Sequence, residues 1–116
     1  MSWKDYPALG ERCYPETLPN GLRLRVVPKP GFAGKFAFLG VNFGSCDTKL
    51  PLSGGWQTVP DGTAHFLEHR MFCLPDCDPE TEFSRLGAET NAFTDYAMTG
   101  YYFTCTEHFE DCLRLL

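Results

Sequence analysis

The sequence predicts an α+β fold, a two-layer sandwich in which helices pack on a largely antiparallel sheet. Several stretches alternate apolar and polar residues with the period of two that half-buried strands show, while others carry the start and stop signals of helices. Their order along the chain is ββααββα. At 116 residues, of which 43% are hydrophobic and 15% aromatic, the chain has the length of one domain and the apolar material for a core.

The first strands are expected after an irregular lead-in. Residues 1–17 are polar and interrupted by prolines, so we expect the domain to begin at residue 18. Asn20-Gly21 predicts a turn, because both residues tolerate positive φ. Residues 22–26 then alternate apolar and charged side chains, which predicts a half-buried strand. Residues 35–44, "KFAFLGVNFG", are apolar on both faces and predict a strand covered on both sides. The simplest pairing joins these two strands in a hairpin.

The next segment predicts a loop followed by a helix. Residues 45–60 are rich in glycine, serine and proline, which favours a loop. Asp61 is a suitable N-cap for a helix over about residues 62–73. Pro75 ends that helix, because proline lacks the amide proton and clashes with the preceding turn.

The rest of the chain predicts a second helix, two strands and a third helix. Asp78-Pro79-Glu80 combines an N-cap, proline at the first helical position and an acid in the first turn. Gly87 is a suitable stop. Residues 88–96 and 99–106 alternate again and predict strands, and a last helix starts near residue 106 or 107.

Charge and composition argue against nucleic-acid and membrane binding. The formal net charge is −5 and the basic residues are few and scattered. The sequence shows no apolar run of the kind found in signal peptides or membrane spans, so we expect a cytosolic protein. In that compartment cysteines stay reduced, and we expect most of the six to be inert and partly buried. They are Cys13, Cys46, Cys73, Cys77, Cys105 and Cys112.

The stretch "GTAHFLEH", residues 62–69, carries the pattern H-x-x-E-H on the first predicted helix. Four residues on a helix correspond to about 40° of rotation and about 6 Å of rise, so His65 and His69 can reach one ion. Imidazole nitrogens are common zinc ligands. Glu68 faces the same region without having to bind the ion, which is the position of a general base acting on a metal-activated water.

Two alternatives compete with this catalytic reading. The first is a helix with two surface histidines and no metal. The second is a structural Cys₂His₂ zinc site, because Cys73 and Cys77 continue the four-residue spacing. Against the second, Pro75 breaks the helical register before Cys77, and Glu68 is left without a role.

The order of motifs resembles the N-terminal part of insulinase/pitrilysin-type zinc metallopeptidases, and most closely their cytosolic Gram-positive bacterial branch. H-x-x-E-H is the inverzincin signature. It lies between "LPNGLRLRVVPKPG" and "LGAETNAFTDYAMTGYYF", so the likeness runs from Leu18 to the end of the chain. The resemblance implies that Zn²⁺ is the cofactor, with His65 and His69 as ligands and Glu68 as the base.

The resemblance also implies a substrate strand and a partner. A segment beside the site would hold short or unfolded peptides, which add to the sheet edge through main-chain hydrogen bonds. That segment is Asn91, Ala92, Phe93 and Thr94. From the residues alone, Asn91 reads more simply as a turn or edge asparagine, and Tyr101 and Tyr102 as core residues. A homologous second subunit or a homodimer is implied as partner.

One departure concerns the third zinc ligand. In the family this ligand is a glutamate on a later helix, several dozen residues beyond the histidine pair. None of Glu89, Glu107 and Glu110 stands at that position. We therefore expect residues 18–116 to be an incomplete peptidase domain whose third ligand lies beyond Leu116. The isolated chain should bind zinc weakly and lack peptidase activity. A non-catalytic homologous subunit is the remaining alternative, although such members typically lose the motif residues that are all present here.

Overall fold

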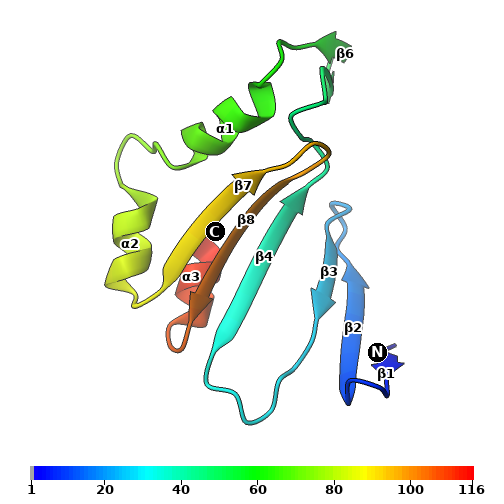
Figure 1. The fold of residues 1–116 in the computed structure, drawn as a ribbon, viewed down its shortest axis with the longest axis vertical. Helices are drawn as coiled ribbons and strands as arrows, with labels where there is room; N and C mark the ends of the chain where they lie inside the picture. The colour runs from blue at the N-terminus through cyan, green and yellow to red at the C-terminus, as the bar shows by residue number, and fades with distance from the viewer. Residues whose placement is uncertain (1) are drawn as a thin grey trace. The chain divides into compact units, whose positions relative to one another are not determined.

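The computed structural model describes residues 2–116, which form two compact units that divide after Ala33. The first unit is an antiparallel sheet with the strand order β1–β2–β3 (Figure 1). Its strands are β1 (Lys4–Tyr6), β2 (Glu11–Thr17) and β3 (Arg23–Val26). The turn before β3 is the predicted one: the Asn20 side-chain oxygen accepts a hydrogen bond from the Leu22 amide, and Gly21 has a φ of 87°.

Two expectations for this region are wrong. The lead-in expected at residues 1–17 is not irregular over residues 2–17, because β1 and β2 occupy most of them, and residue 1 lies outside the described residues. Strand β3 pairs with β2 and not with the strand at residues 35–41. The tight turn at residues 18–22 closes a shorter loop than a hairpin across residues 27–34 would, and a shorter loop costs less entropy to close.

The second unit, residues 34–116, contains a three-stranded antiparallel sheet, a separate hairpin and three helices (Figure 1). The sheet order is β4–β8–β7, so β7 is an edge strand. The strands are β4 (Lys35–Val41), β7 (Glu89–Thr94) and β8 (Thr99–Cys105), and the hairpin is β5 (Lys49–Leu52) with β6 (Gly55–Thr58). The helices are α1 (Thr63–Met71), α2 (Pro79–Arg85) and α3 (Phe109–Leu115). The predicted α+β class with antiparallel sheets is confirmed, whereas the loop expected at residues 45–60 contains the β5–β6 hairpin.

The core of the second unit lies between the sheet and helices α2 and α3. Phe103 of β8 is fully buried, and its ring packs against Phe83 of α2 and Phe109 of α3 at centroid distances of 5.6 and 5.5 Å. The opposite face of the sheet is open, with Phe36 and Phe38 of β4 exposed by 59% and 45%. The expectation that this strand is covered on both sides is therefore wrong, since the helices pack on one face only.

Helix α2 begins and ends as the sequence predicts. The Asp78 side chain accepts a hydrogen bond from the Glu80 amide, and Pro79 occupies the first helical position. Gly87 has a φ of 71°. The amides of Gly87 and Ala88 donate to the carbonyls of Ser84 and Phe83, which is the hydrogen-bond pattern of a Schellman motif. These local signals set where the helix begins and ends, and the packing of Phe83 in the core holds it on the sheet.

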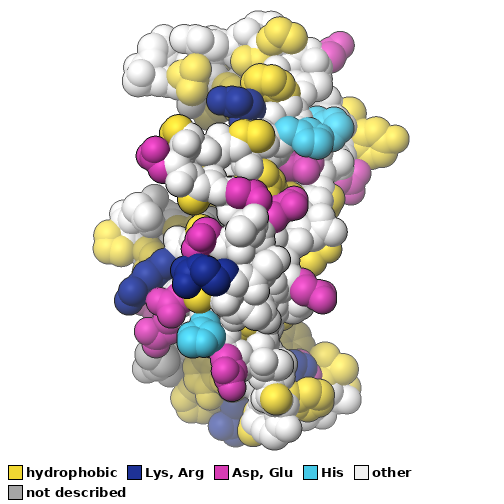
Figure 2. All heavy atoms as spheres, turned by 90° about the vertical axis from the view of Figure 1, so that its left-hand side faces the viewer, with side chains coloured by type: hydrophobic (Ala, Val, Ile, Leu, Met, Phe, Trp, Pro, Cys, Tyr) yellow, Lys and Arg dark blue, Asp and Glu magenta, His cyan; other side chains and the backbone are white. Residues whose placement is uncertain are grey.

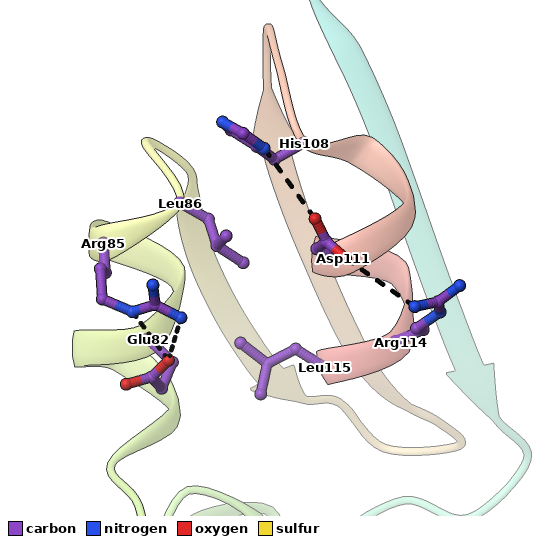
Figure 3. A pocket seen from close by; sticks show the side chains of 7 residues that line it. All are labelled: Glu82, Arg85, Leu86, His108, Asp111, Arg114 and Leu115. Atoms are coloured by element: carbon purple, nitrogen blue, oxygen red, sulfur yellow. Dashed lines mark hydrogen bonds and ion pairs between the residues drawn. The ribbon is translucent and has the colours of Figure 1, made fainter.

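A hollow of about 650 Å³ separates α2 from α3 (Figure 3). Leu86 and Leu115 point into it, and charged side chains surround them. Each arginine at its rim is paired with a carboxylate of its own helix: Arg85 with Glu82, and Arg114 with Asp111. No residue of α1 lines this hollow, so it is distinct from the histidine-bearing helix.

The six cysteines are all free thiols, as expected, but their burial departs in part from the expectation. Cys105 and Cys112 are buried in the core, where burial of the thiol and then the neighbouring Cys105 raise the pKa of Cys112. Three others are exposed: Cys46, Cys73 and Cys77. The expectation of mostly buried cysteines therefore fails for the three that lie outside the helices and strands. Within residues 2–116, the helices are too short or too polar to cross a bilayer.

Candidate metal centre on helix α1

Helix α1 packs on the sheet through one stripe and presents its histidines to solvent. Ala64, 2% exposed, and the half-buried Glu68 and Phe72 follow one another at four-residue spacing, and α1 contacts β7 and β8. The Phe72 ring lies 6.4 Å from that of Tyr101 on β8. His65 and His69 lie on the adjacent stripe and are exposed. Figure 2, which looks onto the side of α1 and α2, shows histidine side chains at the surface.

The start of α1 differs from the prediction. Gly62, with a φ of 81°, is the N-cap, and no side chain caps the helix. Asp61 was expected in this role. Glycine adopts the left-handed conformation without steric cost, so the helix begins one residue later than an Asp61 cap requires. The Phe66 amide donates to the Gly62 carbonyl and closes the first turn that carries His65.

The two imidazoles converge. Their Nε2 atoms are 3.0 Å apart, and the ring centroids are 4.7 Å apart with the planes at 51°. Two nitrogens that bind one zinc ion at about 2.0–2.1 Å and at a tetrahedral angle lie about 3.3 Å apart. The chemistry and the spacing of His65 and His69 therefore fit two ligands of a single zinc ion.

The pair has no further ligand within the described chain. Among residues 2–116, no group of three or more histidine, cysteine, aspartate and glutamate side chains lies close enough to hold a metal ion. The Cys₂His₂ alternative is therefore not formed, because Cys73 and Cys77 do not join the histidines. A catalytic zinc site normally has three protein ligands, so residues 2–116 supply an incomplete set.

Glu68 is held by the sheet. Its Oε2 accepts a hydrogen bond of 2.6 Å from the Thr94 hydroxyl on β7. Tyr101 on β8 also lies near this carboxylate: burial, and then the Glu68 charge, raise the pKa of Tyr101 above its ordinary value. The phenol therefore remains protonated at neutral pH. The helical spacing placed Glu68 beside the histidines, but nothing in the sequence indicated Thr94 as its partner, because 26 residues separate the two.

The segment expected to bind substrate forms most of edge strand β7. Asn91 is exposed, and its side-chain oxygen accepts a hydrogen bond from the Ala92 amide. Phe93 points to the open face and stacks on Phe38 at a centroid distance of 6.1 Å. Thr94 points to the helix face, toward Glu68. The segment is thus adjacent to α1, and its contact with substrate stays a prediction.

The turn between β7 and β8 is clamped by the backbone that follows β4. The Ser45 amide donates to the Asp95 carbonyl at 2.9 Å, and the Cys46 amide donates to the Tyr96 carbonyl at 3.0 Å. Gly44 lies so close to this turn that a Cβ atom there would stand 2.4–2.5 Å from backbone atoms of residues 95–97. This contact was not expected from the sequence, in which the glycine at residue 44 is the signal for it.

Replacing Gly44 by alanine should displace this turn. Backbone atoms cannot yield as a flexible side chain does, so we expect Gly44→Ala to lower the free energy of unfolding by about 1–3 kcal/mol, measured by urea denaturation. Gly54→Ala is the matched control, because a Cβ atom there meets nothing within 4 Å. Equal stability of the two variants would contradict the clamp.

Comparison with known proteins decides the family. The family model described as "Insulinase (Peptidase family M16)" matches residues 57–116, which include the histidine pair, Glu68 and strands β7 and β8. The chain belongs to the insulinase family. The resemblance drawn from its motifs is thereby confirmed. The family is one of peptidases, and the matched range includes the histidine pair and Glu68 on α1.

The relatives of this insulinase-family chain are longer proteins. The "uncharacterized zinc protease YmfH" of Bacillus subtilis is 41% identical over 114 residues, which are 97% of this chain and 27% of that protein. An Arabidopsis thaliana protein named as the β subunit of mitochondrial-processing peptidase is 35% identical over 96 residues, 74% of this chain and 15% of that protein. A crystal structure described as an M16-like peptidase of Alicyclobacillus acidocaldarius matches with a TM-score of 0.84 and 33% identity, over 91% of this chain and 25% of that one.

Proposed function

We propose that these residues carry part of the active site of a zinc-dependent peptidase that hydrolyses short or unfolded peptides. The observation that carries the proposal is the convergence of His65 and His69, whose Nε2 atoms are 3.0 Å apart. Glu68 immediately precedes His69 on the same helix. Relatives named zinc proteases support the same chemistry. The chain spans about a quarter of the length of YmfH, so the activity belongs to the full-length protein, the complete reading frame that contains these residues.

In this proposal the histidines of α1 bind the metal and Glu68 transfers a proton. His65 and His69 would hold the metal, which when bound polarises the scissile carbonyl and makes the attacking water more acidic. Glu68 accepts the proton of that water and later delivers it to the leaving nitrogen. Among residues 2–116, the hydrogen bond to this carboxylate comes from Thr94 and occupies Oε2, which leaves lone pairs of Oε1 for this transfer.

We propose that the peptide adds to β7 as an extra strand. As the edge of the sheet, β7 has main-chain groups on its outer side that β8 does not pair. Asn91 satisfies the Ala92 amide in the absence of peptide, so an added strand would compete with this side chain. Main-chain pairing tolerates varied side chains, which suits a peptidase that acts on unfolded segments. A homologous second subunit is a further proposal, supported by a relative that is named as a subunit.

The proposal is tested on the full-length protein with an unstructured peptide substrate. We expect stoichiometric zinc, cleavage that a chelator abolishes, and recovery on adding zinc back. The isolated 116-residue chain is the control, and we expect it to bind zinc weakly and to leave the peptide intact. A full-length protein that retains its peptidase activity after complete removal of metal would refute the proposal.

A further inference from the structure

Thr94 makes a contact that a substrate-binding residue would not need. Its hydroxyl donates a hydrogen bond of 2.6 Å to Glu68 Oε2, from strand β7 to helix α1. This length lies within the range of about 2.5–2.7 Å expected for a hydroxyl bonded to a charged carboxylate. A hydroxyl has a single proton, so this bond commits the donor of Thr94 to Glu68.

We propose that Thr94 is a positioning residue that sets the orientation of the Glu68 carboxylate. By fixing Oε2, the hydroxyl leaves Oε1 as the oxygen that accepts a proton from the attacking water. A free glutamate side chain samples several rotamers, and restricting them in advance favours the productive geometry. This inference rests on the proposed function, because it assigns Thr94 to the same site.

The side chain of Thr94 is itself firmly placed. Threonine is β-branched and therefore stiff about χ1. The residue pairs with Thr99 across β7 and β8, and just beyond it the Asp95 amide donates to the Met98 carbonyl at 2.8 Å. The backbone at residues 44–46 clamps the same turn. Groups that orient a reactive side chain act best from such rigid elements.

Three variants of the full-length protein separate positioning from simple packing. Thr94→Val removes the hydroxyl at nearly constant volume, and we expect it to lower kcat by about 10- to 100-fold with little change in KM. Thr94→Ser keeps the hydroxyl that donates to Glu68. We therefore expect its kcat to stay within about threefold of the parent value. Thr81→Val is the matched control: it removes a hydroxyl on α2 that also donates to a carboxylate, that of Asp78 at 2.5 Å, and should leave kcat unchanged.

A second readout does not depend on activity. In a crystal structure of the Thr94→Val protein without metal, we expect the Glu68 carboxylate to turn away from β7, whereas in Thr94→Ser it should stay. Zinc content, measured on separately loaded protein, should equal that of the parent in every variant, because His65 and His69 are untouched.

The outcomes are distinguishable from failure of the proposed function. Parent-like kcat in Thr94→Val, an equal loss in Thr94→Ser, or an unmoved Glu68 carboxylate overturns the positioning role. A rise in KM at constant kcat also overturns it and returns Thr94 to substrate contact. If the parent itself cleaves no peptide, the proposed function fails, and the orientation of Glu68 in the crystals still decides whether Thr94 positions it.

Discussion

Replacing Glu68 by glutamine should lower kcat by about 100- to 10,000-fold, the usual contribution of a general acid–base group. The amide has nearly the same shape and can still accept the Thr94 hydrogen bond, but it cannot take up a proton. Zinc content should stay at the parental level, because Glu68 forms no metal-holding group with the histidines. Steady-state kinetics with an unstructured peptide, together with metal analysis, measure both quantities.

Glu110→Gln is the matched control for this prediction, since Glu110 is an exposed glutamate on α3, outside both α1 and β7. It should leave kcat unchanged. A Glu68→Gln protein with parental activity would show that Glu68 is no base. If instead Glu68→Gln abolished peptide cleavage but left both the zinc content and the cellular role unchanged, the alternative of a non-catalytic homologous subunit would replace the peptidase.

Replacing His65 or His69 by alanine should remove the metal and, with it, the activity. Loss of a partner that merely orients a ligand typically weakens metal binding by about 10- to 100-fold, so loss of a ligand should exceed this. We expect the zinc affinity of either variant to fall by more than about 100-fold. Zinc titration against a competing chelator gives the affinity, and peptide hydrolysis should fall to background.

His108→Ala is the control, because His108 is the remaining histidine of the chain and its Nδ1 lies 3.9 Å from Asp111 beside the α2–α3 hollow. It should retain zinc. The Cys₂His₂ site considered from the sequence would have required the opposite result: Cys73→Ser and Cys77→Ser would release zinc while Glu68→Gln would have no effect. Retention of tight zinc by His69→Ala would contradict the assignment of α1 as the metal helix.

Local signals predicted the elements better than their pairing. Asn20-Gly21, Asp78-Pro79 and Gly87 act within a few residues, and the structure confirms each turn or helix end that they predict. The pairing of β4 with β8 joins residues that are 58 (Val41 and Thr99) to 70 (Lys35 and Cys105) positions apart, and alternation alone does not identify such a partner. The hairpin expected between residues 22–26 and 35–44 was wrong for this reason.

In the candidate site, too, the sequence predicted the features that depend on nearby residues and not the contact between distant ones. Helical spacing was enough to predict that His65 and His69 converge, because both lie on one short helix. The N-cap was misassigned, since Asp61 and Gly62 are both acceptable caps and only the backbone conformation decides between them. The bond from Thr94 to Glu68 depends on how α1 docks on β7, which the sequence does not encode as a local pattern.

The proposed site requires His65 and His69 to share one zinc ion on α1. Zinc-edge X-ray absorption of the full-length protein tests this most directly, because Zn–N distances of about 2.0–2.1 Å and Zn–S distances of about 2.3 Å are resolved. We predict two imidazoles and no sulfur around the metal of the parent protein, and no stoichiometric zinc in His65→Ala. A sulfur shell in the parent spectrum, or stoichiometric zinc in His65→Ala, would contradict the proposed site.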